Sequence, residues 1–237
     1  MTGIYLLFFA NILLVNAGIN PKTRVYFKQC MEEDAVENNN ACLLLNAQRV
    51  VALIPSDKPI EIKQWTIKGT KLLSYDQHYQ NIKLYNHHQA KILKAGLEAN
   101  EILETWKLVL EFHVPEVLFV SDYEFEPGSK LLNVDIASKG KVTYHHKDYN
   151  GTLTLSGGVT FDPDANFTAT DSKVSLTMGG MSARFETGDS KLDERINTVY
   201  NANWPAIFED ATGEYTKVYA HVYKNIANDL IFDKEPY

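Results

Sequence analysis

The sequence predicts an α+β fold in which a strongly curved antiparallel β-sheet wraps a long C-terminal helix. Three observations support it: a short helical pattern before Pro55, a long strand-forming segment from Ile60 to about Phe185, and helical spacing again near the C-terminus. A sheet with one apolar face has to bury that face against another element. We therefore expect the sheet to curl around the terminal helix.

The first helix is expected over residues 41–54, where apolar side chains follow helical spacing until Pro55 ends the element. The strands that follow are clearest at 107–114 and 173–178. In the first, Leu108, Leu110, Phe112 and Val114 alternate with more polar residues, and in the second Val174, Leu176 and Met178 do the same. This period of two indicates a sheet with one apolar and one solvated face.

Helical patterns return near the C-terminus. Ser190 and Asp193 form a predicted capping box that begins a helix, and apolar residues at helical spacing predict a second helix over 215–230. Between these two patterns, Pro205 and Gly213 are expected to bend or split the helical region.

Residues 1–17 resemble a secretory signal peptide, so residues 18–237 are predicted to form a single exported domain. Residues 4–15 are almost all apolar but too short to span a bilayer comfortably, and small residues at 15–17 suit cleavage. No Lys or Arg precedes this apolar run. The alternatives are an N-terminal core helix or a membrane anchor.

The composition is that of a soluble globular protein. Of the 237 residues, 45% are hydrophobic and 22% charged, and the formal net charge is −7. This acidic balance argues against nucleic acid as a partner, because binding phosphates needs a basic surface. No stretch after the N-terminal segment approaches transmembrane length.

If the protein is exported, its two cysteines can form a disulfide and its two sequons can be glycosylated. Cys30 and Cys42 are expected to form a disulfide in an oxidising compartment. Asn150 and Asn166 begin Asn-x-Thr triplets near turn-like segments at 147–151 and 162–164, which favours exposure and possible glycosylation.

A resemblance to a known family is carried by several short motifs. The C-terminal third contains Gly188-Asp189-Ser190-Lys191-Leu192, Ile196-Asn197, Asn201-Ala202-Asn203-Trp204 and a tail with Ile231-Phe232 and Pro236. Together with the strand at 132–140 and the cysteine pair before a helix, these motifs resemble the insect takeout and haemolymph juvenile-hormone-binding protein family.

The resemblance implies a secreted carrier in which the sheet and helix enclose an apolar tunnel for juvenile hormone, another isoprenoid, a lipid or a semiochemical. The sequence departs from the family pattern in three places: a shortened segment at 54–59, Asp135 in place of a proline, and Glu186-Thr187 before Gly188. Because these departures could reshape the mouth of the tunnel, the resemblance does not specify the ligand.

Aromatic and aliphatic residues on the predicted elements are the candidates for the ligand-binding wall. Tyrosines on the terminal helix combine an apolar body with a hydrogen-bonding tip and could orient a ligand. The candidate residues are Phe112, Trp204, Phe208, Tyr215, Tyr219, Val222 and Tyr223.

Enzymatic, metal and cofactor chemistry find no support in the motifs. The sequence contains no nucleophile elbow, zinc-protease motif, P-loop or dinucleotide fingerprint. The pairs His87-His88 and His145-His146 are interpreted as solvated strand histidines, since neighbours in a strand point to opposite faces. We therefore predict no catalytic residues, no metal site and no cofactor.

Alternative functions remain open at this point. The aromatic content would equally suit a planar pigment such as an ommochrome. A secreted interaction module that binds a cell-surface receptor, with its tunnel filled by side chains, is a further alternative. A monomer is expected in each case. The lipocalin fold fits poorly, because its N-terminal G-x-W signature is absent and the terminal helix is long.

Overall fold

A computed structural model describes residues 30, 36–100, 104–160 and 166–232. The predicted signal peptide at 1–17 and the Pro236 motif lie outside the described residues. The elements are α2 (Val36–Val51), β1 (Ile60–Ile67), β2 (Gln77–Tyr85), η1 (His87–Gln89), β3 (Lys91–Asn100), β4 (Thr105–Phe125), β5 (Lys130–Leu131), β6 (Val134–Asp135), β7 (Ser138–Thr160), β8 (Asn166–Phe167), β9 (Asp171–Thr177), β10 (Gly180–Glu186), α3 (Ser190–Ala202), α4 (Trp204–Ala227) and η2 (Asn228–Phe232).

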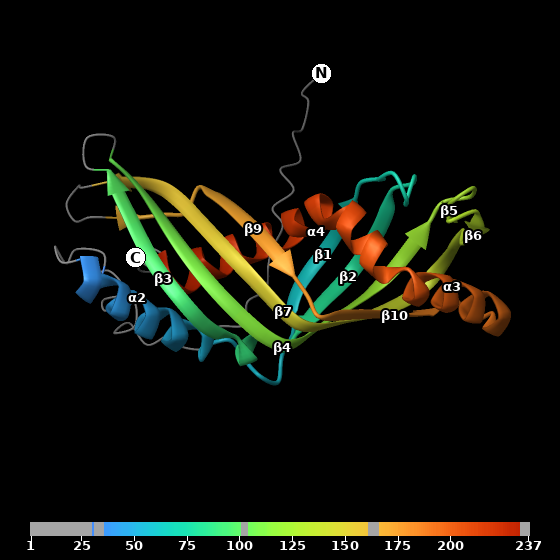
Figure 1. Ribbon diagram of the computed structural model, residues 1–237, viewed down its shortest axis with the longest axis horizontal. Coiled ribbons are helices and arrows are strands. Elements are labelled where there is room, and N and C mark those ends of the chain that lie inside the picture. Colours follow the sequence, from blue (N-terminus) through green and yellow to red (C-terminus); the bar gives the residue numbers. More distant parts are fainter. Residues whose placement is uncertain (1–29, 31–35, 101–103, 161–165, 233–237) are drawn as a thin grey trace, which may run out of the picture.

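Two long strands form the spine of the sheet. β4 and β7 pair antiparallel from Thr105 opposite Gly158 to Phe125 opposite Ser138. β3 and β2 pair with opposite halves of β4, β9 and β10 pair with opposite halves of β7, and β1 extends the sheet beyond β2. Figure 1 shows the long strands bending at mid-length, with α3 and α4 lying along the sheet. The predicted curved antiparallel sheet and long C-terminal helix are confirmed.

The predicted strand alternation is also confirmed. In β4, Leu108, Leu110, Phe112 and Val114 are buried, each at most 7% exposed, whereas the residues between them are not buried. At β9 the same face is less completely covered: Leu176 is buried, Val174 is half-buried, and Met178, which directly follows the strand, is half-buried as well. The apolar face of the sheet therefore packs inward, as period-two patterning requires.

The helical region divides at a different place from the one predicted. Asp189, not Ser190, caps α3, because its side chain accepts hydrogen bonds from the backbone amides of Lys191 and Leu192. Pro205 lies in the first turn of α4, where a proline is tolerated. Gly213 does not split the region, since α4 runs unbroken for 24 residues.

Two asparagines of α3 attach that helix to the sheet edge. Asn197 accepts a hydrogen bond from the Phe185 amide at 2.7 Å and donates to the Phe185 carbonyl at 3.1 Å. One helical turn later, Asn201 makes the same pair of bonds with Ala183, at 2.7 and 2.9 Å. The side chains thus satisfy backbone groups on the edge of β10 that no other strand of the described residues pairs. Both residues belong to the motifs noted in the sequence.

The turn expected at 147–151 is wrong, because β7 continues through this segment. Asp148 has φ 47°, and the pairing of β7 with β4 keeps the same register on both sides of it. Asn150 is half-buried, and its Nδ2 donates to the Asp148 carbonyl at 2.8 Å. Its glycosylation stays a prediction, as does that of Asn166, whose side chain is outside the described part.

The first helix lies close to its expected position. It begins earlier than predicted, at Val36, and ends at Val51, after which two i→i+3 hydrogen bonds from Leu53 and Ile54 form a turn before Pro55. α2 packs against β3. Within the described ranges, no helix is both long and apolar enough to cross a membrane.

Candidate functional site

A cavity of about 90 Å³ lies between α2, the start of β3, the long strands and the C-terminal end of α4. α2 contributes Ala47, Val50 and Val51 to its lining, with Ile54 just beyond the helix. The end of α4 and η2 contribute Ile226, Ala227 and Ile231. The lining is apolar apart from two side chains, His87 and Tyr223.

The strand side of the cavity follows from the alternating pattern of β4 and β7. Leu110, Phe112 and Val114 from β4 and Leu153 and Leu155 from β7 face the cavity. The register is Phe112 opposite Gly151. A Cβ atom at Gly151 would lie 2.4 Å from Cζ of Phe112, so the glycine leaves the space that the phenyl ring occupies.

The polar end of the cavity is a chain of three buried side chains. The hydroxyl of Tyr223 lies 3.1 Å from Nε2 of His87 and 3.2 Å from the hydroxyl of Tyr149. Burial lowers the pKa of His87 to about 4, a shift that the Tyr85 backbone carbonyl opposes. The imidazole is therefore neutral near pH 7, and the group presents hydrogen-bonding atoms without a charge.

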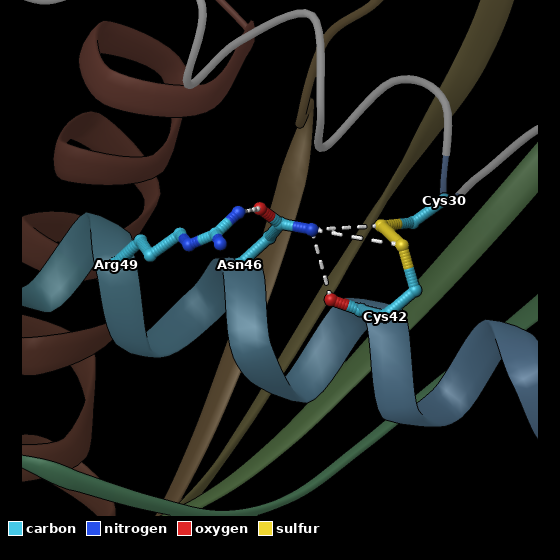
Figure 2. The surroundings of a disulfide bond; sticks show 4 residues. All are labelled: Cys30, Cys42, Asn46 and Arg49. Atoms are coloured by element: carbon cyan, nitrogen blue, oxygen red, sulfur yellow. Dashed lines mark hydrogen bonds between the residues drawn. A yellow bond between two sulfur atoms is a disulfide. The ribbon is translucent and has the colours of Figure 1, made fainter.

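The disulfide attaches the chain at Cys30 to helix α2. Cys30 and Cys42 are bonded, as predicted, with their Cα atoms 5.6 Å apart. Figure 2 shows Asn46, one turn after Cys42, donating to Sγ of Cys30 at 2.9 Å and to the Cys42 carbonyl at 3.0 Å. Arg49 donates to the Asn46 oxygen at 3.1 Å. These contacts hold one face of α2, beside the residues that line the cavity.

Gln48 attaches α2 to the sheet. Its amide nitrogen donates to the Ala90 carbonyl at 3.0 Å, and its oxygen accepts from the Ile92 amide at 2.9 Å. Ala90 lies between η1 and β3, and Ile92 is the second residue of β3. The two bonds fix the helix across the cavity, since Ala90 and Ile92 themselves contribute to the lining.

Beyond the cavity, aromatic side chains fill the space between α4 and the sheet. Tyr219 and Tyr149 follow Tyr223, and His146 stacks on Tyr144 with a ring separation of 6.1 Å. Further along, four phenols form a second buried group. The contacts in this group include Tyr79 to Tyr144 at 2.9 Å and Tyr200 to Tyr215 at 3.3 Å between hydroxyl oxygens. The structure therefore shows an apolar cavity near the C-terminal end of α4, and the predicted tunnel stays a prediction.

The predicted wall residues divide along α4. Phe112 and Tyr223 line the cavity. Tyr219 and Val222 are buried and lie within one helical turn of Tyr223. Tyr215 belongs to the second phenol group. Trp204 and Phe208 are half-buried at the start of α4. Sequence reasoning missed the α2 residues and His87. The apolar stripe of α2 was visible, but nothing local indicated what it faces.

The interpretation of the histidine pairs as solvated strand residues is wrong for one member of each pair. His87 is 4% exposed and lies in η1, and His146 is 3% exposed within β7. Burial lowers the pKa of His146 to about 3. Its neighbour His145 faces the other side and contacts Glu116 at 3.0 Å. Across the described residues, no group of three or more His, Cys, Asp or Glu could hold a metal.

Comparison with known proteins places this geometry in a family. Takeout 1 of Epiphyas postvittana is 16% identical and has a TM-score of 0.64, with 81% of this chain and 90% of that chain covered. A structure titled lipopolysaccharide binding protein reaches a TM-score of only 0.30 at 10% identity, with coverage of 77% and 37%. No curated protein sequence matches. The model of the haemolymph juvenile hormone binding protein family matches residues 8–237, and the chain belongs to that family.

Proposed function

We propose that the protein is a secreted carrier that binds a small hydrophobic ligand in the cavity between α2 and the end of α4. The observation that carries this proposal is the lining, which is apolar except for one uncharged hydrogen-bonding group. Such a combination is typical of sites that bury an apolar body and orient it through a single polar contact. The family description, juvenile hormone binding, makes isoprenoids, lipids and semiochemicals the ligand classes to test.

Secretion is part of the proposal. The Cys30–Cys42 disulfide suits an oxidising compartment, and the family is named for haemolymph, a body fluid. The apolar segment at 4–15 would direct export. The acidic net charge favours solubility in such a fluid.

The decisive experiment is native mass spectrometry of the protein secreted from insect cells, followed by solvent extraction. We expect a bound apolar species, or its uptake on incubation with juvenile hormone and fatty alcohols. The variant Ala47→Phe should prevent binding, because a phenyl ring at this buried position of α2 would fill the cavity. Ala41→Phe, at an exposed position of the same helix, is the matched control.

A second candidate is a secreted interaction module that binds a cell-surface receptor as a monomer. The small size of the cavity favours it, since about 90 Å³ is less than the roughly 150 Å³ that holds benzene. An apo mass that stays unchanged after incubation with apolar molecules and pigments would support the module and refute the carrier. Absorbance above roughly 350 nm in the purified protein would instead indicate a bound conjugated pigment.

A further inference from the structure

We propose that the aromatic wall at the inner end of the cavity restricts this protein to compact, uncharged ligands with one oxygen-containing polar group. The wall is formed by His87, His146, Tyr149, Tyr219 and Tyr223. The inference rests on the carrier function proposed above. It adds the length and the charge of the ligand, neither of which follows from that function.

The length limit follows from the continuity of the wall. Ring centroids are 6.0 Å apart between Tyr223 and Tyr219 and 5.5 Å between Tyr219 and Tyr149. The series continues at 6.2 Å from Tyr149 to His146 and 6.1 Å from His146 to Tyr144. Rings at these separations are in van der Waals contact with one another. Tyr149, Tyr219 and His146 are also at most 3% exposed, so almost no empty space lies beside their rings. A ligand that enters beside α2 therefore meets packed rings once it reaches Tyr223.

The volume of the cavity limits the size of the ligand. At about 90 Å³ it is smaller than the cavity of roughly 150 Å³ that accepts the six carbons of benzene. Small shifts of the lining side chains would admit a few more atoms, whereas a chain of about sixteen carbons needs several times this volume. Compact molecules are thus favoured over long lipids.

The charge limit follows from the polar end. Among the described lining residues there is no Lys, Arg, Asp or Glu, and His87 is neutral. A carboxylate bound here would be a buried, unpaired charge, which is far more costly than a buried hydroxyl. The Tyr223 phenol both donates and accepts hydrogen bonds, so it can share one with a hydroxyl or carbonyl oxygen.

The test measures affinity along a series of primary alcohols from butanol to hexadecanol, by displacement of a fluorescent apolar probe from the full chain. Affinity should rise about fourfold with each added methylene while the chain fills the cavity. Scaled from six carbons in roughly 150 Å³, with a few more atoms for small shifts of the lining, this rise should stop at about four to eight carbons. Octanoate at pH 7 should bind at least tenfold more weakly than octanol.

Two variants connect these limits to the wall. Tyr149→Ala removes one ring and should move the length limit toward longer alcohols, whereas Tyr123→Ala removes a buried ring outside the wall and should not. Tyr223→Phe keeps the ring and removes the hydroxyl, so the length limit should remain. The ratio of the affinities of the Tyr223→Phe variant for hexanol and for chlorohexane, which has no hydroxyl, should be several-fold lower than in the unaltered protein.

Different failures have different meanings. If affinity of the unaltered protein keeps rising to hexadecanol, or if octanoate equals octanol, this inference is overturned while the carrier function stands. If no alcohol, ester or carboxylate displaces the probe and none binds directly, the carrier function fails as well. The measurements on the unaltered protein decide the matter even where Tyr149→Ala does not fold.

Discussion

Replacing Gly151 by alanine tests whether the register between β4 and β7 shapes the cavity. The added Cβ would lie 2.4 Å from Cζ, 2.8 Å from Cε1 and 3.0 Å from Cε2 of the Phe112 ring. Contacts below 3 Å require one partner to move. The backbone of Gly151 does not have a positive φ, so the alanine itself is tolerated and the clash with the ring dominates.

The expected cost is that of forcing a methyl group against a buried ring, about 1–3 kcal/mol of the free energy of unfolding. For a protein of this size, that loss lowers the melting temperature by roughly 2–12 °C. Because Phe112 lines the cavity, the displaced ring is expected to move into that space, so the apolar volume should shrink and probe binding should weaken. The sequon at Asn150 keeps its Asn-x-Thr pattern, which leaves possible glycosylation unchanged.

Calorimetry and urea unfolding of Gly151→Ala measure the effect, with Gly180→Ala as the matched control. Gly180 is also a strand glycine, but a Cβ there would be 3.8 Å from its nearest neighbour, an ordinary contact. The control should be within about 0.5 kcal/mol of the unaltered protein. If the two variants are equally stable, the steric argument about Gly151 and Phe112 is refuted.

Three further predictions concern stability. His87 and His146 have folded pKa values of about 4 and about 3 against 6.5 in the unfolded chain, so the unfolded chain binds more protons below pH 6.5 and the free energy of unfolding falls as the pH drops. Each histidine should lower the free energy of unfolding by about 2 kcal/mol at pH 5. A melting temperature that stays constant from pH 7 to 5 would contradict this. Replacing Cys30 and Cys42 by serine should lower the free energy of unfolding by about 3 kcal/mol in urea titrations, and no change would argue against the disulfide. Asn201→Ala leaves two strand-edge backbone groups without their partner and should cost about 1–3 kcal/mol, which an unshifted urea midpoint would exclude.

Patterns that involve only neighbouring residues predicted the fold well. The alternation in β4 identified its buried face because each strand residue faces one side only. Errors arose where two local preferences competed. Asp189 and Ser190 are both good caps, and sequence alone could not choose between them. The Asn-Gly pair at 150–151 suggested a turn, but pairing with β4 and β9 carries β7 straight through it.

The site was predicted less well, because it depends on which segments meet. The apolar stripe of α4 runs along a helix of 24 residues, about 36 Å at 1.5 Å per residue, whereas the cavity lies at its C-terminal end only. Tyr215 and Tyr223 carry the same chemistry in the sequence and differ only in this position. Locating the cavity requires knowing that α2 and the end of α4, which are distant in sequence, line the same space. The burial of His87, whose Nε2 lies 3.1 Å from the Tyr223 hydroxyl, depends on the same arrangement.

The two ends of α4 therefore differ in packing: the start of the helix belongs to a tightly packed core, and the end lines a cavity. Near its start, α3, β10 and the second phenol group form a solid core in which rings pack against rings. Near its end, the cavity leaves apolar side chains without partners, which costs about 2 kcal/mol at roughly 24 cal/mol per Å³. A ligand that fills the space recovers that energy and stabilises only the folded state. Substitutions in the phenol group should thus lower stability without changing ligand preference, and those around the cavity should change both.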